Sequence, residues 1–215
     1  GVHGGALALQ GPHAVSTARG LFTEPPAGLS CSVWVRPVEL GGFREILRQE
    51  SDQRLLLSFQ EGGAVLSLGL SIGGYVECDA AIDAARVADG QWHHCAGTFD
   101  GQTMRVFFDG SEVGSLQRPG SVSVDVETPV FIGSLSGELE HFQGSMDDLR
   151  VYAEALTEED VATLYRAGAG ALQQREAAVR GRLEALYQQE DTLARTMAGL
   201  RRRVVDERVP LDQEL

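Results

Sequence analysis

Short apolar runs recur along the first three quarters of the chain, and turn residues separate them at regular intervals. Asp100-Gly101, Asp109-Gly110 and Glu61-Gly62-Gly63 interrupt runs that are only six to nine residues long. An Asp-Gly pair between apolar runs is the strongest local indication of a β-hairpin, because its tight turn needs residues that tolerate positive φ. This punctuation predicts a sandwich of antiparallel strands.

The turns define the predicted elements. Residues 29–38 place Leu, Cys and Val alternately on one face, as in a half-buried strand. A short helix is predicted near residue 160, with Thr157 as its N-cap, Asp160 at the capping-box position and Gly168 at its end. The other predicted strands are residues 54–60, 64–72, 92–99, 103–109, 112–116, 130–133 and 146–152.

The composition changes near residue 168, which predicts a boundary between two parts. Residues 1–168 contain 23 of the 26 Gly and all 8 Phe, with 10 Arg against 23 acidic residues. Residues 169–215 contain 8 Arg and 8 acidic residues, so the net charge of −13 lies entirely in the first part. We therefore predict a sandwich domain over 1–168 and a separate helical segment over 169–215.

The second part has apolar residues at every seventh position, which predicts a long helix with an interaction stripe. Glu176 and Glu190 interrupt this stripe. A helix of this kind is unstable in water unless its stripe is covered. The cover is expected to be a second copy, the sandwich, or another protein segment. The predicted interface residues are Leu172, Val179, Leu183, Leu186, Leu193, Met197, Leu200 and Val204.

The charge and hydropathy of the chain disfavour two classes of partner. A net charge of −13 and a pI of about 4.7 are unsuited to nucleic acid, whose phosphates require clustered cations. No run of 18 apolar residues is present, so no membrane span is expected.

Three segments resemble a known family in the same order along the chain. They are LSCSVWVRP at 29–37, GQWHHCAGTFDG at 90–101 and FQGSMDDLRVYAEALTEEDVATLYRAG at 142–168. Together they resemble laminin G-like jelly-roll domains of the concanavalin A-like lectin/glucanase superfamily, over residues 3–168. The resemblance implies two curved antiparallel sheets in a binding module, commonly attached to secreted or surface proteins. We therefore expect an exported bacterial protein that is extracellular, periplasmic or on the cell surface.

The superfamily includes glucanases, which cleave glycans with a pair of carboxylates. Only Glu138 and Glu140 approach the spacing of a glycosidase carboxylate pair, and no third acid follows at the required step. His93 and His94 are adjacent on a predicted strand, so they face opposite sides and cannot share one metal ion. No Gly-x-Ser-x-Gly motif is present. The chain is therefore predicted not to be an enzyme.

The three cysteines lack the spacing of a zinc site. Cys31 and Cys95 occupy inward strand positions, where free thiols act as small apolar side chains. Free thiols are favoured, and a Cys78–Cys95 disulfide is the alternative if the two strands are neighbours.

The cofactor that the sequence favours is a structural calcium ion. Asp147 and Asp148 match the acidic pair of the family's last-strand motif, and the resemblance can place them beside the carbonyls of Gly4-Gly5. The alternative is that Asp148 pairs with a neighbouring arginine such as Arg150 and that Asp147 is exposed.

Aromatic residues near turns are candidates for a sugar-stacking surface. Phe43, Tyr75 and Phe142 lie where the binding loops of sandwiches are found. Trp34 and Trp92 fall within strand motifs and are expected in the core.

The sequence thus predicts a concanavalin A-like jelly roll followed by a short helix and a long C-terminal helix. The favoured function is a non-catalytic recognition or assembly module that binds a protein partner. The first alternative is a carbohydrate-binding module, with or without calcium. A glycoside hydrolase is the weakest alternative.

Overall fold

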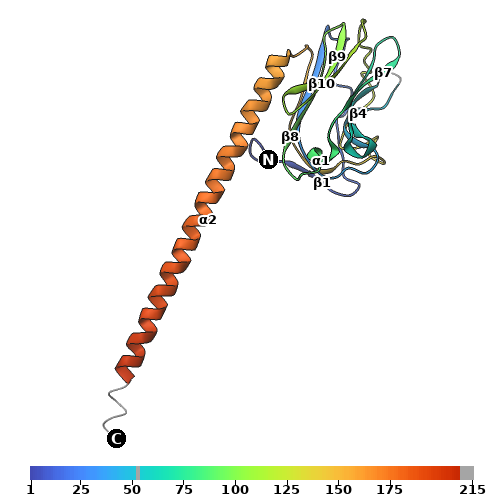
Figure 1. Ribbon diagram of the computed structural model, residues 1–215. Helices are drawn as coiled ribbons and strands as arrows, with labels where there is room; N and C mark the ends of the chain where they lie inside the picture. The colour runs from blue at the N-terminus through green and yellow to red at the C-terminus, as the bar shows by residue number, and fades with distance from the viewer. Residues whose placement is uncertain (52–53, 209–215) are drawn as a thin grey trace. The chain divides into compact units, whose positions relative to one another are not determined.

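A computed structural model describes residues 1–51 and 54–208, with side chains described up to residue 203. Two six-stranded antiparallel sheets face each other, as predicted (Figure 1). Sheet A has the order β1-β12-β3-β8-β9-β10, and sheet B has the order β2-β11-β4-β5-β6-β7. Sheet A contains β1 (Leu7–Leu9), β3 (Leu29–Glu39), β8 (His93–Phe99), β9 (Thr103–Phe108), β10 (Ser111–Gln117) and β12 (Gln143–Tyr152). Sheet B contains β2 (Val15–Ser16), β4 (Arg44–Gln49), β5 (Leu55–Gln60), β6 (Val65–Ser71), β7 (Tyr75–Ala81) and β11 (Phe131–Ile132).

Tight turns join the consecutive strands that the sequence indicated. Asp109 and Gly110 both have positive φ between β9 and β10, as a type I′ turn requires. A short 3₁₀ helix, η1 (Glu61–Gly63), joins β5 to β6, and Gly62 and Gly63 have positive φ there. The sequence analysis missed β1, β2, β4, β7 and the short helix α1 (Ala84–Val87).

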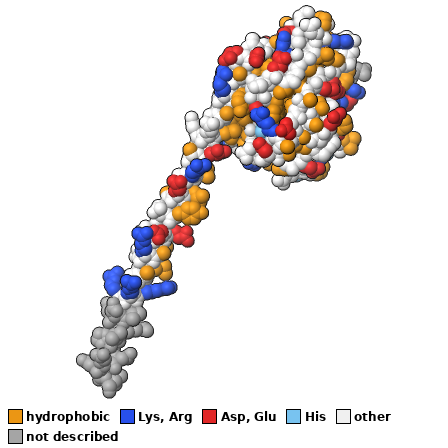
Figure 2. Space-filling view, viewed as in Figure 1, with side chains coloured by type: hydrophobic (Ala, Val, Ile, Leu, Met, Phe, Trp, Pro, Cys, Tyr) orange, Lys and Arg blue, Asp and Glu red, His pale blue; other side chains and the backbone are white. Residues whose placement is uncertain are grey.

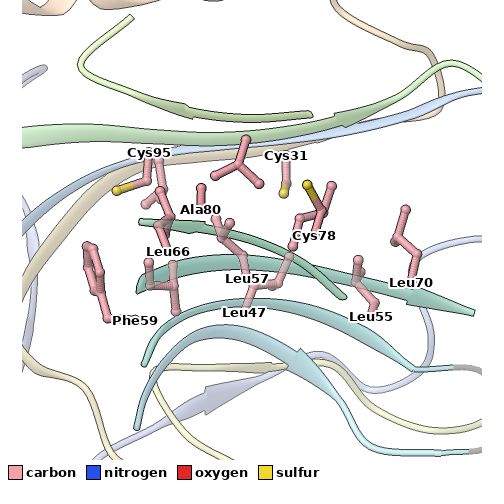
Figure 3. Packing of buried hydrophobic residues seen from close by; sticks show 14 of the residues in the cluster. Cys31, Leu47, Leu55, Leu57, Phe59, Leu66, Leu70, Cys78, Ala80 and Cys95 are labelled. Carbon is pink, nitrogen blue, oxygen red and sulfur yellow. The ribbon is translucent and has the colours of Figure 1, made fainter. Parts of the chain in front are cut away.

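The core lies between the two sheets and is built by every second residue of their strands (Figure 3). Cys31 and Cys95 contribute from sheet A, and Cys78 contributes from sheet B. All three cysteines are free and buried, so the disulfide alternative is wrong: Cys78 and Cys95 lie in different sheets. Burial raises the pKa of the Cys31 thiol to about 12 and that of Cys78 to about 11.

One continuous helix, α2 (Glu158–Arg208), replaces the two predicted helices. Its capping box is confirmed: Asp160 N donates to Thr157 Oγ1 at 3.2 Å, and Thr157 N donates to the Asp160 carboxylate at 2.9 Å. Gly168 does not end the helix. It lies inside the helix instead, where a Cβ atom would be 2.5 Å from the indole of Trp34. Glycine is thus required there for close packing and not for a cap.

The first turns of α2 cover the outer face of sheet A. Val161 packs with Ala96 and Phe107 in a small buried cluster. The ring of Tyr165 stacks on Trp34 with centroids 5.7 Å apart. Trp34 is buried as predicted. Trp92 is only partly buried, contrary to the prediction, and the Arg36 guanidinium lies 5.5 Å from its ring centroid.

The chain divides into two compact units, Gly1–Ala169 and Gly170–Leu215. The described part of the second unit is entirely helical. None of the helices in the described part of the chain has the length and apolar character needed to cross a bilayer.

Candidate functional site

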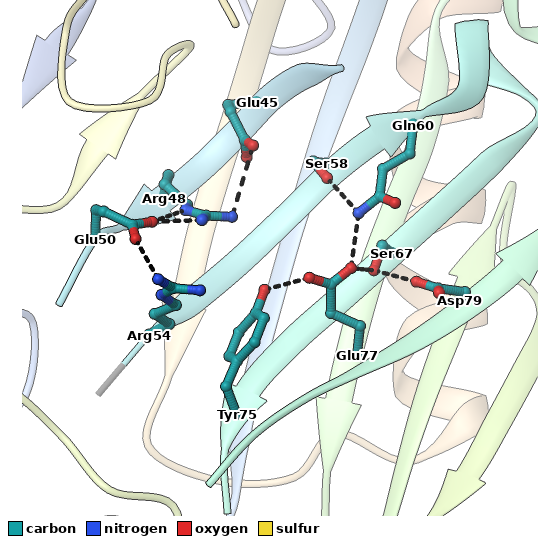
Figure 4. A network of polar contacts seen from close by, with 10 residues as sticks. All are labelled: Glu45, Arg48, Glu50, Arg54, Ser58, Gln60, Ser67, Tyr75, Glu77 and Asp79. Atoms are coloured by element: carbon teal, nitrogen blue, oxygen red, sulfur yellow. Dashed lines mark hydrogen bonds and ion pairs between the residues drawn. The ribbon is translucent and has the colours of Figure 1, made fainter. Parts of the chain in front are cut away.

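Polar side chains gather on the face of sheet B that points away from the core (Figure 4). Core residues such as Leu57, Leu68 and Cys78 occupy alternate positions on β5, β6 and β7. The positions between them place polar groups on the opposite face, because strand side chains alternate. We name this surface the sheet B polar face. Its residues are Glu45, Arg48, Glu50, Arg54, Ser58, Gln60, Ser67, Tyr75, Glu77 and Asp79.

Glu77 is the centre of one half of this face. Its carboxylate accepts hydrogen bonds from Tyr75 Oη at 2.6 Å, Gln60 Nε2 at 2.8 Å and Ser67 Oγ at 3.2 Å. Burial alone would raise the pKa of Glu77, but these three donors outweigh it and lower the pKa. Glu77 is therefore ionised at neutral pH. Asp79, which is exposed on the same strand, lies 2.6 Å from Ser67 Oγ, so Glu77 and Asp79 share the single hydroxyl proton of Ser67.

Two arginines occupy the other half, and both are paired with Glu50. Arg48 Nε donates to Glu50 Oε2 at 2.7 Å, and Arg54 Nη2 lies 2.9 Å from Glu50 Oε1. The Arg54 guanidinium also lies 5.1 Å from the ring centroid of Tyr75. One carboxylate, that of Glu50, thus holds both guanidinium groups in place. Through Arg54 it also connects the end of β4 to the ring of Tyr75.

Glu45 is a buried acid at the rim of this face. A β-bulge between Glu45 and Leu47 interrupts the pairing of β4 with β5. The Glu45 side chain is only 2% exposed, and its Oε2 has no hydrogen-bond donor among the described residues. Burial, followed by the carboxyl of Glu140 within hydrogen-bonding reach, raises the pKa of Glu45 to about 9. Arg48 Nη1, which lies 3.7 Å from Glu45 Oε1, acts against this rise, but burial outweighs it and favours the protonated form of Glu45 at neutral pH.

The structure separates the three aromatic residues predicted to bind sugar. Tyr75 belongs to the sheet B polar face, at the end of the sheet where β5 begins. Phe43 is 47% exposed but precedes Arg44, which pairs with Phe59 towards the opposite end of β5. Phe142 is fully buried in the core, so its assignment to an exposed platform was wrong. Its position next to a turn gave no information about its direction.

Asp147 and Asp148 are occupied by protein donors. Asp147 accepts hydrogen bonds from the backbone N–H groups of His3 and Asp148, each at 2.9 Å. Asp148 accepts from Arg150 Nε at 2.7 Å, as the alternative interpretation proposed. No group of three His, Cys, Asp or Glu side chains suited to a metal ion occurs within the described residues. Calcium binding by Asp147 and Asp148 stays a prediction, and their present partners are the donors named above.

The two adjacent histidines have separate structural environments. His93 lies 3.0 Å from Asp109 Oδ2 through Nδ1 and 3.1 Å from Asp89 Oδ1 through Nε2. His94 lies on the other side of β8, against Trp34, where burial lowers its pKa to about 4. Their opposite directions confirm that they cannot bind one metal ion together.

Apart from Leu172, the described apolar positions of the helical stripe are strongly exposed, and Figure 2 shows apolar side chains along α2. Exposure ranges from 48% at Leu183 to 67% at Val179. Leu172 is partly buried, and the side chain of Val204 lies outside the described residues. The other exposed members are Leu186, Leu193, Met197 and Leu200.

The comparison with known families agrees with this architecture. The profile of the concanavalin A-like lectin/glucanases superfamily matches residues 9–162. The chain belongs to this superfamily. A search of curated proteins gives no significant match.

Solved structures of binding domains share the superfamily fold. Domain 4 of AbnA, an extracellular GH43 arabinanase from Geobacillus stearothermophilus in complex with arabinotriose, is 21% identical with a TM-score of 0.57. That match covers 73% of this chain and 75% of that domain. The CBM40 of a Ruminococcus gnavus IT-sialidase, bound to α2,3-sialyllactose, is 12% identical with a TM-score of 0.54, covering 71% and 96%. The binding domain of botulinum neurotoxin serotype G is 14% identical with a TM-score of 0.57, covering 74% and 41%. At these identities the likeness concerns the fold.

Sequence reasoning missed most of the polar face in this superfamily member. Glu45, Arg48, Gln60 and Glu77 were not singled out, although Tyr75 was. A signal was present, because the sequence of β7 alternates Tyr, Glu and Asp with Val, Cys and Ala. Such a strand predicts one polar face, but only the pairing of β4 to β7 brings these side chains together.

Proposed function

We propose that this chain is a non-catalytic binding module that takes a neutral, hydroxyl-rich glycan on the sheet B polar face. The observation that carries the proposal is the network centred on Glu77, in which a tyrosine, a glutamine and a serine share one carboxylate. Carboxylate, amide and hydroxyl groups on a sheet form strong, directional hydrogen bonds with sugar hydroxyls. Partial exposure of Gln60, Tyr75 and Glu77 leaves these groups accessible to a ligand.

The charge of the face favours neutral sugars over sialic or uronic acids. Glu50, Glu77 and Asp79 supply carboxylates, whereas both guanidinium groups already pair with Glu50. An anionic sugar would meet net negative charge without a free cation to bind it. The overall charge of −13 acts in the same direction.

A non-catalytic role is supported by the geometry of Glu45 and Glu140. Glycosidases hold two carboxyl groups about 5 to 9.5 Å apart, which leaves room for the scissile bond or a water molecule. The Glu45 side chain is only 2% exposed, and its backbone N donates to Glu140 O at 3.0 Å, so the Glu45 carboxyl is not accessible to a glycosidic bond. Binding without cleavage is also consistent with the arabinotriose and sialyllactose complexes of structural neighbours.

A glycan array of the full chain tests the proposal, with calcium and again with a chelator. We expect binding to neutral oligosaccharides and none to their sialylated or uronic acid counterparts. Calcium dependence stays an untested prediction, and the chelator arm checks it.

Variants then locate the site. Glu77→Gln and Asp79→Asn should each weaken binding at least about tenfold, which corresponds to one lost charge-assisted hydrogen bond. Glu112→Gln is the matched control, because Glu112 lies on β10 of the other sheet. A blank array, or binding that Glu77→Gln leaves intact, would contradict the assignment.

A role in protein assembly is the second candidate, and a different part of the chain favours it. The helix beyond Gly170 exposes seven large apolar side chains, including Tyr187, which indicates a surface that another polypeptide covers. An extracellular or cell-surface location, as for the extracellular arabinanase neighbour, fits both roles and is part of the proposal.

A further inference from the structure

The exposed stripe of the second unit has the spacing of a coiled-coil seam. Its first row repeats every seven residues at Leu172, Val179, Leu186, Leu193 and Leu200. Its second row lies four residues after the first, at Glu176, Leu183, Glu190 and Met197. Alternating steps of four and three residues match a partner helix that lies along the whole stripe. A folded domain with an irregular groove does not require such a strict repeat.

We propose that the partner is the same helix of a second copy, aligned antiparallel. This inference is independent of glycan binding, because it rests on the second unit alone. Antiparallel alignment centred on residue 188 sets each first-row residue opposite a second-row residue. It pairs Glu176 with Leu200, Val179 with Met197, Leu183 with Leu193 and Leu186 with Glu190.

The two seam glutamates decide the direction. In a parallel, in-register dimer, Glu176 would face Glu176 and Glu190 would face Glu190, because identical positions form each layer. Two like charges in a desolvated seam are strongly unfavourable. In the antiparallel alignment, each glutamate faces a leucine, and its carboxylate can reach solvent beside the seam.

The charges that flank the seam support the same alignment. Arg201, Arg202 and Arg203 lie at one end of the stripe and Glu176 lies at the other. Antiparallel pairing of Glu176 with Leu200 brings the partner's arginine run beside the Glu176 carboxylate, a favourable contact in each half of the dimer. Parallel pairing would gather both arginine runs at one end and both copies of Arg175 and Arg180 at the other.

Light scattering of the full chain tests whether the second copy is the partner. We expect a dimer at micromolar concentration, and we expect Leu186→Asp together with Leu193→Asp to produce a monomer. Gln174→Asp with Gln188→Asp is the matched control, because these positions lie on the side of the helix opposite the seam. This control should remain dimeric. A monomeric wild type, or a double leucine variant that stays dimeric, would overturn the proposal.

Cross-linking with a short bismaleimide tests whether the two helices run antiparallel. The first cross-linking variant keeps every seam residue. Gln189→Cys lies beside the centre of the antiparallel alignment, so it should cross-link to the same cysteine of the second copy. Leu172→Cys should not, because the two copies of residue 172 lie about 48 Å apart along the antiparallel helices, at 1.5 Å per residue. The three native cysteines are buried, so they provide a silent background. Cross-linking through Leu172→Cys and not through Gln189→Cys would establish a parallel dimer and overturn the antiparallel assignment.

Discussion

The Cα atom of Gly168 lies against the indole ring of Trp34 and leaves no room for a side chain. A Cβ atom at this position would be 2.5 Å from Nε1, Cε2 and Cζ2 of the indole. Trp34 lies on β3 and is buried beneath the start of α2, with Tyr165 stacked on it, so it has little freedom to move. The close approach joins the start of the long helix to the sandwich.

Replacement of Gly168 by alanine should therefore destabilise the first unit. Alanine is the better helix former by about 1 kcal/mol, but overpacking against a rigid buried ring costs about 1–3 kcal/mol. We expect a lower midpoint in urea or thermal denaturation of the full chain, monitored by tryptophan fluorescence.

Gly170→Ala is the matched control two residues further along the helix. A Cβ at Gly170 has no atom within 4 Å, so only helix propensity changes. This variant should be neutral or more stable by up to about 1 kcal/mol. Equal effects of both substitutions would show that the Trp34 contact is not restrictive.

Asp109 joins the start of β8 to the turn after β9, and its removal should be costly. Its carboxylate lies 3.0 Å from His93 Nδ1, accepts from His94 N at 3.0 Å and pairs with Arg86 at 2.6 Å. Losing the acceptor of a buried charge-assisted network costs about 2–4 kcal/mol. Asp109→Ala should lower the free energy of unfolding by that amount, as measured by urea denaturation of the full chain. Asp89→Asn, which alters the more exposed partner of His93, should cost less than about 1 kcal/mol.

A second substitution of Asp109, to asparagine, should change the titration of His93. Burial lowers the pKa of His93, but hydrogen bonds to Asp109 and Asp89 outweigh burial and raise it. Stability from this group is thus fully present below the unfolded pKa of about 6.5 and is lost as pH rises through the folded value. NMR titration of the full chain should give a lower pKa for His93 in Asp109→Asn than in the wild type. An unchanged value would contradict the coupling.

Local signals in the sequence predicted most strands and their turns, because a hairpin is specified by adjacent residues. Asp109-Gly110 is an example, since both residues adopt the positive φ that the turn requires. Gly168 shows the limit of such reasoning. A glycine near the end of a short apolar pattern indicates a helix cap, but the same residue also permits close packing. Only the position of Trp34, 134 residues earlier, distinguishes the two.

Most of the sheet B polar face could not be predicted from the sequence for a related reason. Glu77 lies in a strand whose alternation was readable, but its donors Gln60 and Ser67 come from β5 and β6. Glu45 and Glu140 come from segments 95 residues apart, joined by the backbone hydrogen bond from Glu45 N to Glu140 O. Their proximity depends on the position of the 134–142 loop beside β4, which no local pattern specifies.

Glu45 makes the stability of the protein depend on pH in an unusual direction. Its pKa is raised from 4.5 to about 9, chiefly by burial and then by Glu140. Between these values the folded chain holds a proton that the unfolded chain releases, so the free energy of unfolding falls as pH rises. The loss is at most about 1.4 kcal/mol per pH unit for one proton.

Glu45→Gln retains the shape of the side chain and removes this titration. The Tm of the variant should therefore rise relative to that of the wild type between pH 6 and pH 9. The rise should be about 2–4 °C for each kcal/mol that the wild type loses. Parallel thermal unfolding curves across this range measure the difference. Glu138→Gln is the control, because Glu138 is exposed in the same loop, and it should follow the wild type. If the wild type and Glu45→Gln keep a constant separation from pH 6 to pH 9, Glu45 is already ionised in the folded chain and the protonated assignment is wrong.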